Sequence, residues 1–351
     1  MSKAEKIKNF DPNGVGLANG KFIGLPFEKE DAEVVFLPVP WDVTVSYAEG
    51  TAEGAANILQ ASGQLDLFDP FVSDAWKIGH YMCPISEDWL HRSRVLRAQA
   101  KVYIDALESG KKVSDKPELK NILSQINQVS QELNTWVYQE SSELLKAGKL
   151  VGLVGGEHST PLGYLQALAE QYTSFGILQL DAHMDLRKAY EGFTYSHASI
   201  FYNALQLPAI EQLVQVGIRD YCEEEYDFAQ AQVDRIQVFY DHDIHRQLFE
   251  GKPFQSICEA VIQSLPAFVY ISFDIDALNP SLCPHTGTPV PGGLNFNQAI
   301  YLIKKVVDSG KRIIGFDLSE VAGLGYEWDG NVGARILYRL ANLAAKSQNR
   351  I

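Results

Sequence analysis

The feature that most constrains the fold is a series of short runs rich in Val, Ile, Leu and Phe, separated by segments of helical length. Several runs are apolar almost throughout instead of alternating, which is typical of parallel strands covered on both faces. Eight runs are predicted strands: Val34–Val39, Trp76–Tyr81, Leu150–Val154, Phe175–Leu180, Leu213–Ile218, Ile236–Tyr240, Phe268–Phe273 and Arg312–Leu318. Because strands that alternate with helices are joined by right-handed crossovers, the sequence predicts an α/β fold. The expected architecture is a three-layer α/β/α arrangement around an eight-stranded, mainly parallel sheet.

No feature of the sequence indicates a boundary between two domains. No Gly/Ser-rich or Pro-rich linker and no internal repeat interrupts the pattern of strands and helices, so we expect a single domain over residues 1–351. A long, polar, helical segment is predicted at about residues 86–147. It carries one apolar stripe at spacings of four and three, formed by Ile122, Ile126, Val129, Leu133 and Trp136. The stripe favours a helix packed on the sheet, and an oligomer contact is the alternative.

The charge balance narrows the classes of partner. The chain has 44 acidic and 30 basic residues and a net charge of −14, which disfavours nucleic acid and anionic membranes as partners. It is compatible with a small cationic substrate. The four cysteines are scattered, and the N-terminus has no apolar signal region, so we expect a cytoplasmic protein with reduced thiols.

Polar clusters follow four of the predicted strands, where ligands of open α/β sheets bind. The segments are Gly155–Ser159, Asp181–Asp185, Asp274–Asp276 and Ser319–Glu320. Short motifs of this kind are weak evidence one at a time, because most are surface turns or caps. Their combination is strong, since burying so many carboxylates without a cation is severely unfavourable.

The composition of these clusters points to divalent metal ions. An i, i+2, i+4 spacing in extended backbone sends Asp181, His183 and Asp185 to one side, and Asp274 with Asp276 repeats the device. Carboxylates with imidazoles suit divalent transition metals, and hard oxygen ligands favour Mn. With a second imidazole from His158, the set has four carboxylates and two imidazoles, which is enough for two metal ions.

These motifs resemble the ureohydrolase family of arginase, agmatinase and formiminoglutamase over nearly the whole chain. Gly155–Ser159 is similar to the first metal motif, with Glu157 where Asp is common. Asp181–Asp185 matches the second motif, and Ser272–Asp276 matches the third. The resemblance implies a two-metal centre, usually manganese, and frequent trimers or hexamers. One ion would be held by His158, Asp181, Asp185 and Asp274, and the other by His183, Asp181, Asp274 and Asp276.

The resemblance also implies a mechanism. A hydroxide bridging two cations about 3.5–4 Å apart would attack the guanidino carbon, and an amine and urea would leave. Glu320 is similar to the family carboxylate that binds the guanidinium group. His197 is similar to the proton-shuttling histidine of the family.

The loop Leu186–Ser196 indicates the substrate, because it should pass the outer end of the bound molecule. Arginases carry Asn, Thr and Ser there, and that pattern is absent. Arg187 with Tyr190-Glu191-Gly192 is more similar to bacterial agmatinases, so agmatine is the expected substrate. Guanidinobutyrate, guanidine, arginine and formiminoglutamate, with Arg187 as a carboxylate partner, remain alternatives. A catalytically silent binding subunit is disfavoured because all six ligands are present, and a one-metal zinc deacetylase is disfavoured by the second Asp-x-Asp element.

Overall fold

The computed structural model describes residues 1–113 and 116–350, while residues 114, 115 and 351 lie outside the described part. Within it, eight strands form one sheet in which all neighbours are parallel, in the order β2-β1-β3-β8-β7-β4-β5-β6. The strands are β1 Val34–Val39, β2 His80–Met82, β3 Leu150–Gly155, β4 Phe175–Leu180, β5 Ile210–Ile218, β6 Ile236–Tyr240, β7 Phe268–Asp274 and β8 Arg312–Ser319. The predicted eight-stranded parallel sheet is confirmed.

The predicted strand Trp76–Tyr81 is wrong at its beginning. Residues Ala75–Ile78 form a 3-10 turn, and the strand is the short edge strand β2. Gly79, at a φ of 81°, ends the turn. The indole of Trp76 packs against the rings of Phe10 and Phe27 instead of lying in the sheet. Apolar composition alone does not separate a buried 3-10 turn from a buried strand.

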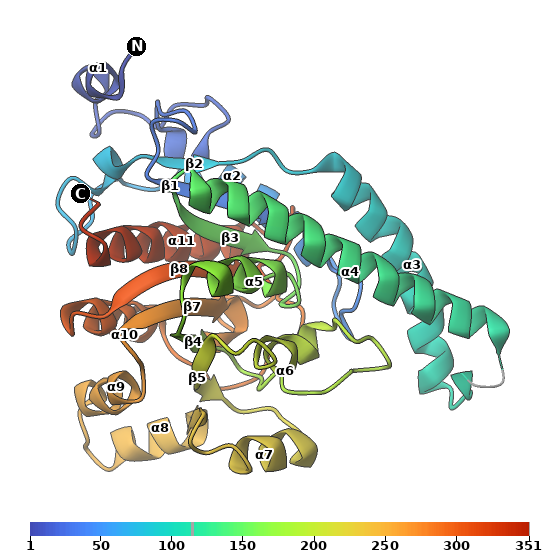
Figure 1. Cartoon of the computed structure of the whole chain (residues 1–351). Coiled ribbons are helices and arrows are strands. Elements are labelled where there is room, and N and C mark those ends of the chain that lie inside the picture. The colour runs from blue at the N-terminus through green and yellow to red at the C-terminus, as the bar shows by residue number, and fades with distance from the viewer. Residues whose placement is uncertain (114–115, 351) are drawn as a thin grey trace.

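Helices cover both faces of the sheet (Figure 1). One apolar core includes residues of β1 and β8 with α2 Gly54–Ser62, α8 Asp241–Phe249, α9 Phe254–Gln263, α10 Phe296–Asp308 and α11 Glu327–Ser347. The other includes α3 Glu87–Glu108, α4 Pro117–Lys146, α5 Leu162–Gln171, α6 Ile200–Ala204 and α7 Glu223–Gln230. The three layers are therefore as predicted. That residues 1–351 form one domain stays a prediction.

The segment 86–147, apart from residues 114–115, contains the two long helices α3 and α4. Both project to one side of the sheet (Figure 1). Ile126 and Leu133 of the apolar stripe are buried, and Trp136 packs against Trp89 of α3. The stripe belongs to the core on this face of the sheet, which agrees with the first of its two interpretations.

Four adjacent strands place the polar clusters side by side. β3, β8, β7 and β4 are consecutive in the sheet, and each is followed by one cluster. Since parallel strands end at the same edge, these clusters meet above the centre of the sheet. No helix within residues 1–113 and 116–350 has the length and apolar composition needed to cross a lipid bilayer.

Candidate metal centre

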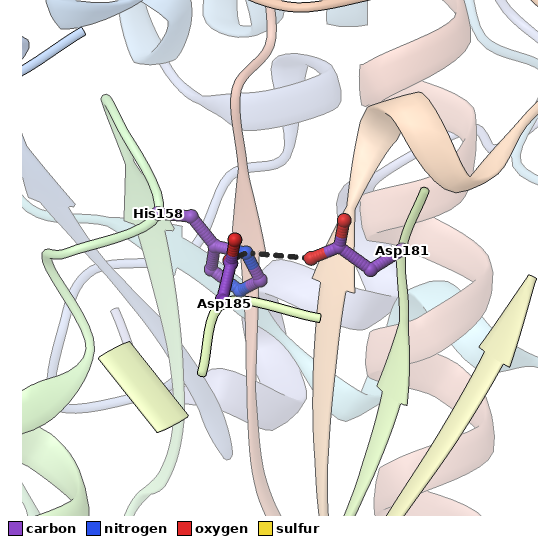
Figure 2. A group of neighbouring side chains, drawn as sticks. All are labelled: His158, Asp181 and Asp185. Atoms are coloured by element: carbon purple, nitrogen blue, oxygen red, sulfur yellow. Dashed lines mark ion pairs between the residues drawn. The ribbon is translucent and has the colours of Figure 1, made fainter. Parts of the chain in front are cut away.

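The first group of side chains surrounds the imidazole of His158. Its Nδ1 lies 3.0 Å from Asp181 Oδ2, 3.1 Å from Asp185 Oδ2 and 3.3 Å from Asp274 Oδ2. Figure 2 shows His158, Asp181 and Asp185 pointing toward one another. The four side chains come from the ends of β3, β4 and β7 and are all buried. The structure therefore brings together the four residues that the family resemblance implies for one ion.

The second group shares Asp181 with the first. His183 Nδ1 lies 3.1 Å from Asp276 Oδ2 and 3.5 Å from Asp181 Oδ1. Backbone N–H groups hold these carboxylates in place: the amide of His183 donates to Asp181 Oδ1 and that of Ala182 to Asp276 Oδ1. Two neighbouring groups, each able to hold a cation, thus meet at Asp181.

A hydrogen-bond chain behind His158 assigns its tautomer. Ser272 Oγ donates to Asp317 Oδ2 at 2.7 Å, so its oxygen must accept the proton of His158 Nε2 at 2.9 Å. The Nδ1 of a neutral His158 then carries a lone pair directed at three carboxylates. Such an arrangement is repulsive unless a cation, either a proton or a metal ion, lies at Nδ1. Burial opposes a charge on His158, but the three carboxylates raise its pKa well above the usual range.

Two further observations show that the group fits divalent cations. Within the described residues, His158 Nδ1, Asp276 Oδ2 and Glu320 Oε2 are buried without a hydrogen-bond partner, and such atoms are costly unless something binds them. Burial, and then the charge of Asp181, raises the pKa of Asp185 to about 7. Burial, and then Asp276, raises the pKa of Asp274 well above its usual range. Negative charge therefore exceeds what the protein groups alone stabilise.

Glu320 lies directly after β8 in a left-handed backbone conformation, with a φ of 62°. Its Oε1 accepts the backbone N–H of His158 at 2.9 Å. A methyl group at Gly287 would come within 2.8 Å of Glu320 Oε2, so glycine leaves space beside that oxygen. Strained conformations of non-glycine residues concentrate at functional sites, and Asp185 has a φ of 55°.

His197 is connected to the glycine-rich motif after β3 through Thr44. Glu157 accepts the N–H of Thr44 at 2.6 Å and its hydroxyl at 2.7 Å. Thr44 Oγ1 accepts the backbone N–H of His197 at 3.1 Å and lies 3.4 Å from its Nδ1. Burial lowers the pKa of His197 to about 3, so the imidazole is neutral near pH 7.

A cavity of about 370 Å³ opens beside these groups. Asp185, His183 and His197 lie in its wall, whereas Glu320 lies deeper, outside the residues that line it. The outer wall comes from separate loops and from the start of α7, and it includes Ser46, Tyr47, Arg187, Tyr190, Asp220, Tyr221, Glu225 and Thr288–Val290. The candidate metal ligands therefore lie beside a cavity large enough for a small organic molecule.

The charged groups of the outer wall differ in their partners. Arg187 stacks over the ring of Tyr190 at 4.6 Å, and its Nε lies 3.6 Å from Glu225 Oε2. Glu225 also accepts the backbone N–H groups of Leu186 and Cys222. Asp220 is largely exposed and, within the described residues, has no Lys or Arg partner; His183 Nε2 is 4.0 Å away.

Sequence reasoning missed the residues that support the centre: Thr44, Gln179, Gln215, Ser272, Asp317 and Asp220. For four of these residues the available signal was a polar residue inside an apolar strand, whereas Thr44 and Asp220 lie outside the strands. Gln179 of β4 donates to Asp181 Oδ2 at 2.9 Å, and Gln215 of β5 donates to Gln179 at 2.6 Å. His285 pairs with Asp329 at 2.9 Å and lies outside the cavity wall.

Comparison with known proteins agrees with this geometry. The sequence model of a family described as the arginase family matches residues 32–341. The chain is 33% identical over 316 residues to N(1)-aminopropylagmatine ureohydrolase of Thermus thermophilus, covering 90% of this chain and 91% of the relative. It is 28% identical to an agmatinase of Bacillus anthracis, covering 84% of each.

Similarity extends to solved structures. Proclavaminate amidino hydrolase of Streptomyces clavuligerus superposes with a TM-score of 0.72 at 22% identity, covering 95% of this chain and all of the other. At this identity the structural match establishes the shared fold.

Proposed function

The chain belongs to the arginase family, and from this premise we propose that it hydrolyses the guanidino C–N bond of agmatine to give putrescine and urea. The observation that carries the proposal is the pair of buried ligand groups that share Asp181 beside an open cavity. This arrangement supports a hydrolase with two metal ions. A catalytically silent binding subunit would be expected to lose metal-ligating residues, and all six are present in the sequence.

Two divalent ions, for which manganese is the proposed metal, would be held by the two groups. His158, Asp181, Asp185 and Asp274 would hold one, and His183, Asp181, Asp274 and Asp276 the other. When bound, such ions supply Lewis acidity and a water molecule with a pKa lowered toward about 7. Ser272 and Asp317 keep His158 in the tautomer that this role requires.

Glu320 and His197 complete the proposed machinery. Glu320 is proposed to pair with the guanidinium group, because its Oε2 is buried without a partner and Gly287 leaves space beside it. That pairing would fix the guanidino carbon relative to the metal ligands. His197 lies in the cavity wall with a neutral imidazole, and it is proposed to carry a proton to the leaving amine.

The outer wall supports a substrate with a cationic tail. Asp220 is a carboxylate in the cavity wall without a Lys or Arg partner in the described residues, and it suits the terminal ammonium of agmatine. Arg187 is the cation of the wall, and its charge is offset by Glu225. An α-carboxylate, as in arginine or formiminoglutamate, therefore finds a less favourable environment than an ammonium group.

A second candidate substrate is N(1)-aminopropylagmatine, on which the Thermus thermophilus relative acts according to its name. That relative is 33% identical over 90% of this chain, and its substrate also ends in an ammonium group. Tyr221, which also lines the cavity, would be available to the longer tail.

Urea release by manganese-loaded protein tests the proposal. Agmatine and N(1)-aminopropylagmatine are compared with arginine, guanidinobutyrate and guanidine, and ammonia release is measured with formiminoglutamate. We expect the highest kcat/KM for one of the first two. A preference for arginine or formiminoglutamate would contradict the proposed substrate class, and failure of all six with two bound ions per chain would contradict the proposed function.

A further inference from the structure

Helix α3 holds the loop between β1 and α2, which forms one side of the cavity. Arg97, whose side chain is 12% exposed, donates to the carbonyls of Val45 at 2.6 Å and Val43 at 3.3 Å. Ser93 Oγ accepts the backbone N–H of Asp42 at 3.1 Å and donates to Asp42 Oδ1 at 3.1 Å. This loop supplies Thr44 to His197, and Ser46 and Tyr47 to the cavity wall.

Helices α3 and α4 together hold the loop on the other side. Tyr103 of α3 donates to the carbonyl of Glu191 at 2.9 Å. Asn127 of α4 donates to the carbonyl of Gly192 at 3.1 Å and accepts the N–H of Thr194 at 2.8 Å. These bonds fix the tight turn in which Phe193 donates to Tyr190, the residue that faces the cavity.

The contacts leave little freedom in the turn. Glu191 has a left-handed φ of 54°, and a methyl group at Gly192 would lie 3.0 Å from Tyr103 Oη and 3.2 Å from the side chain of Leu123. The ring of Phe193 packs on Tyr103 at 5.3 Å. A strained turn keeps its conformation when its surroundings determine it, and here those surroundings are the two helices.

We infer that the α3–α4 pair is the element that sets the shape of the outer cavity, with Asn127 and Tyr103 as positioning residues for the substrate tail. The inference rests on the proposed function, because the tail must belong to a guanidino compound. Neither residue lines the cavity, so each acts through the loop that it holds. The metal ligands come from the strand ends instead, and the helix pair therefore affects recognition of the tail more than the metal centre.

The test is the Asn127→Ala variant, with Gln125→Ala as the matched control on an exposed face of the same helix. We expect the KM for agmatine to rise about five- to 150-fold, the range that two ordinary hydrogen bonds supply, with kcat within about twofold. Ethylguanidine, whose tail is too short to reach Tyr190, should be affected much less. Asn127→Asp keeps the acceptor for Thr194 and should restore part of the loss.

Hydrogen exchange of the metal-loaded variants gives a readout that does not depend on turnover. The amide of Thr194 should exchange faster in Asn127→Ala than in the Gln125→Ala control, because its acceptor is lost. Unchanged exchange at Thr194, or equal effects on agmatine and ethylguanidine, would overturn the inference. The proposed function fails separately, when the unaltered protein releases urea from no guanidino compound.

Discussion

The imidazole of His158 has its Nε2 side fixed by Ser272, so its Nδ1 side is left facing three carboxylates. Glu320 similarly has one oxygen satisfied by a backbone N–H and one buried without a partner. In each case, the half of the group that is hydrogen-bonded determines where the free half points. The free halves converge on the region where the metal ions and the guanidinium group are proposed to bind.

Asp274→Asn removes one of the charges proposed to bridge the ions. We expect metal content measured by plasma spectrometry to fall and urea release to become undetectable, because an amide is a far weaker ligand than a carboxylate. Near-normal turnover would show that the two-metal assignment is wrong. Glu211→Gln, at an exposed position of β5, is the control and should retain activity.

His197→Ala removes the proposed proton carrier and leaves the six ligands in place. Turnover of the metal-loaded variant should fall about 10²–10⁴-fold, with metal content unchanged. Loss of metal together with activity would instead assign His197 a role in metal binding.

Asp220→Asn removes the negative charge proposed to recognise the tail. The ratio of kcat/KM for agmatine to that for butylguanidine, which has a similar tail without the ammonium, should fall about ten- to hundredfold. Asp220 is also 4.0 Å from His183. If its role were only structural, the variant would lower kcat/KM equally for both substrates and leave the ratio unchanged. Glu224→Gln, on the exposed side of α7, controls for the general loss of charge.

Among the elements, the helix pair α3 and α4 has two functions that the sequence pattern did not separate. The apolar stripe of α4 packs in the core beneath it, while polar residues of the same helices hold the two cavity loops. The strands show a similar division. Their apolar residues build the core, and the few polar ones, such as Gln179 and Asp317, support the candidate metal ligands.

Leu133→Ala tests whether the stripe acts within one chain. Leu133 is 1% exposed, so the cavity left by truncation should lower the free energy of unfolding by about 2–5 kcal/mol. Sedimentation should show the same oligomeric state as the unaltered protein. A change of oligomeric state with little loss of stability would favour the alternative, in which the stripe is an oligomer contact.

For the molecule as a whole, the burial of His80 predicts a loss of stability in acid. His80 on the edge strand β2 is 1% exposed, lies between the rings of Phe36 and Tyr338, and has a pKa lowered to about 3 by burial. Its folded pKa is below its ordinary value of 6.5, so the stability it contributes is present above pH 6.5. That stability is lost as the pH falls from 6.5 toward about 3.

The trimeric or hexameric assembly stays a prediction.

His80→Phe should therefore weaken the loss of stability in acid. We expect the urea midpoint of the variant to fall less between pH 6.5 and pH 3 than that of the unaltered protein, since each pKa unit corresponds to about 1.4 kcal/mol. His91→Gln, at an exposed position, is the control and should follow the unaltered protein. An equal fall of the urea midpoint below pH 6.5 in His80→Phe and in the unaltered protein would contradict this account.

The sequence by itself determined the sheet and the grouping of the candidate metal ligands at its edge. Runs such as Phe175–Leu180 are apolar on both faces, so they predict buried parallel strands, and Asp181, His183 and Asp185 follow at a spacing that extended backbone directs to one side. These are local properties, because strand and side-chain direction depend on a few consecutive residues.

Only the tertiary structure decided which groups are left free. Glu157 meets Thr44 across 113 positions of the sequence, Ser272 meets Asp317 across 45, and Asn127 meets Gly192 across 65. Such contacts decide which charge is available to a substrate. Glu225 offsets the charge of Arg187, whereas no Lys or Arg within the described residues pairs with Asp220. Hydrogen bonds between distant segments leave no periodic signal in the sequence, so the folded chain alone reveals the partners.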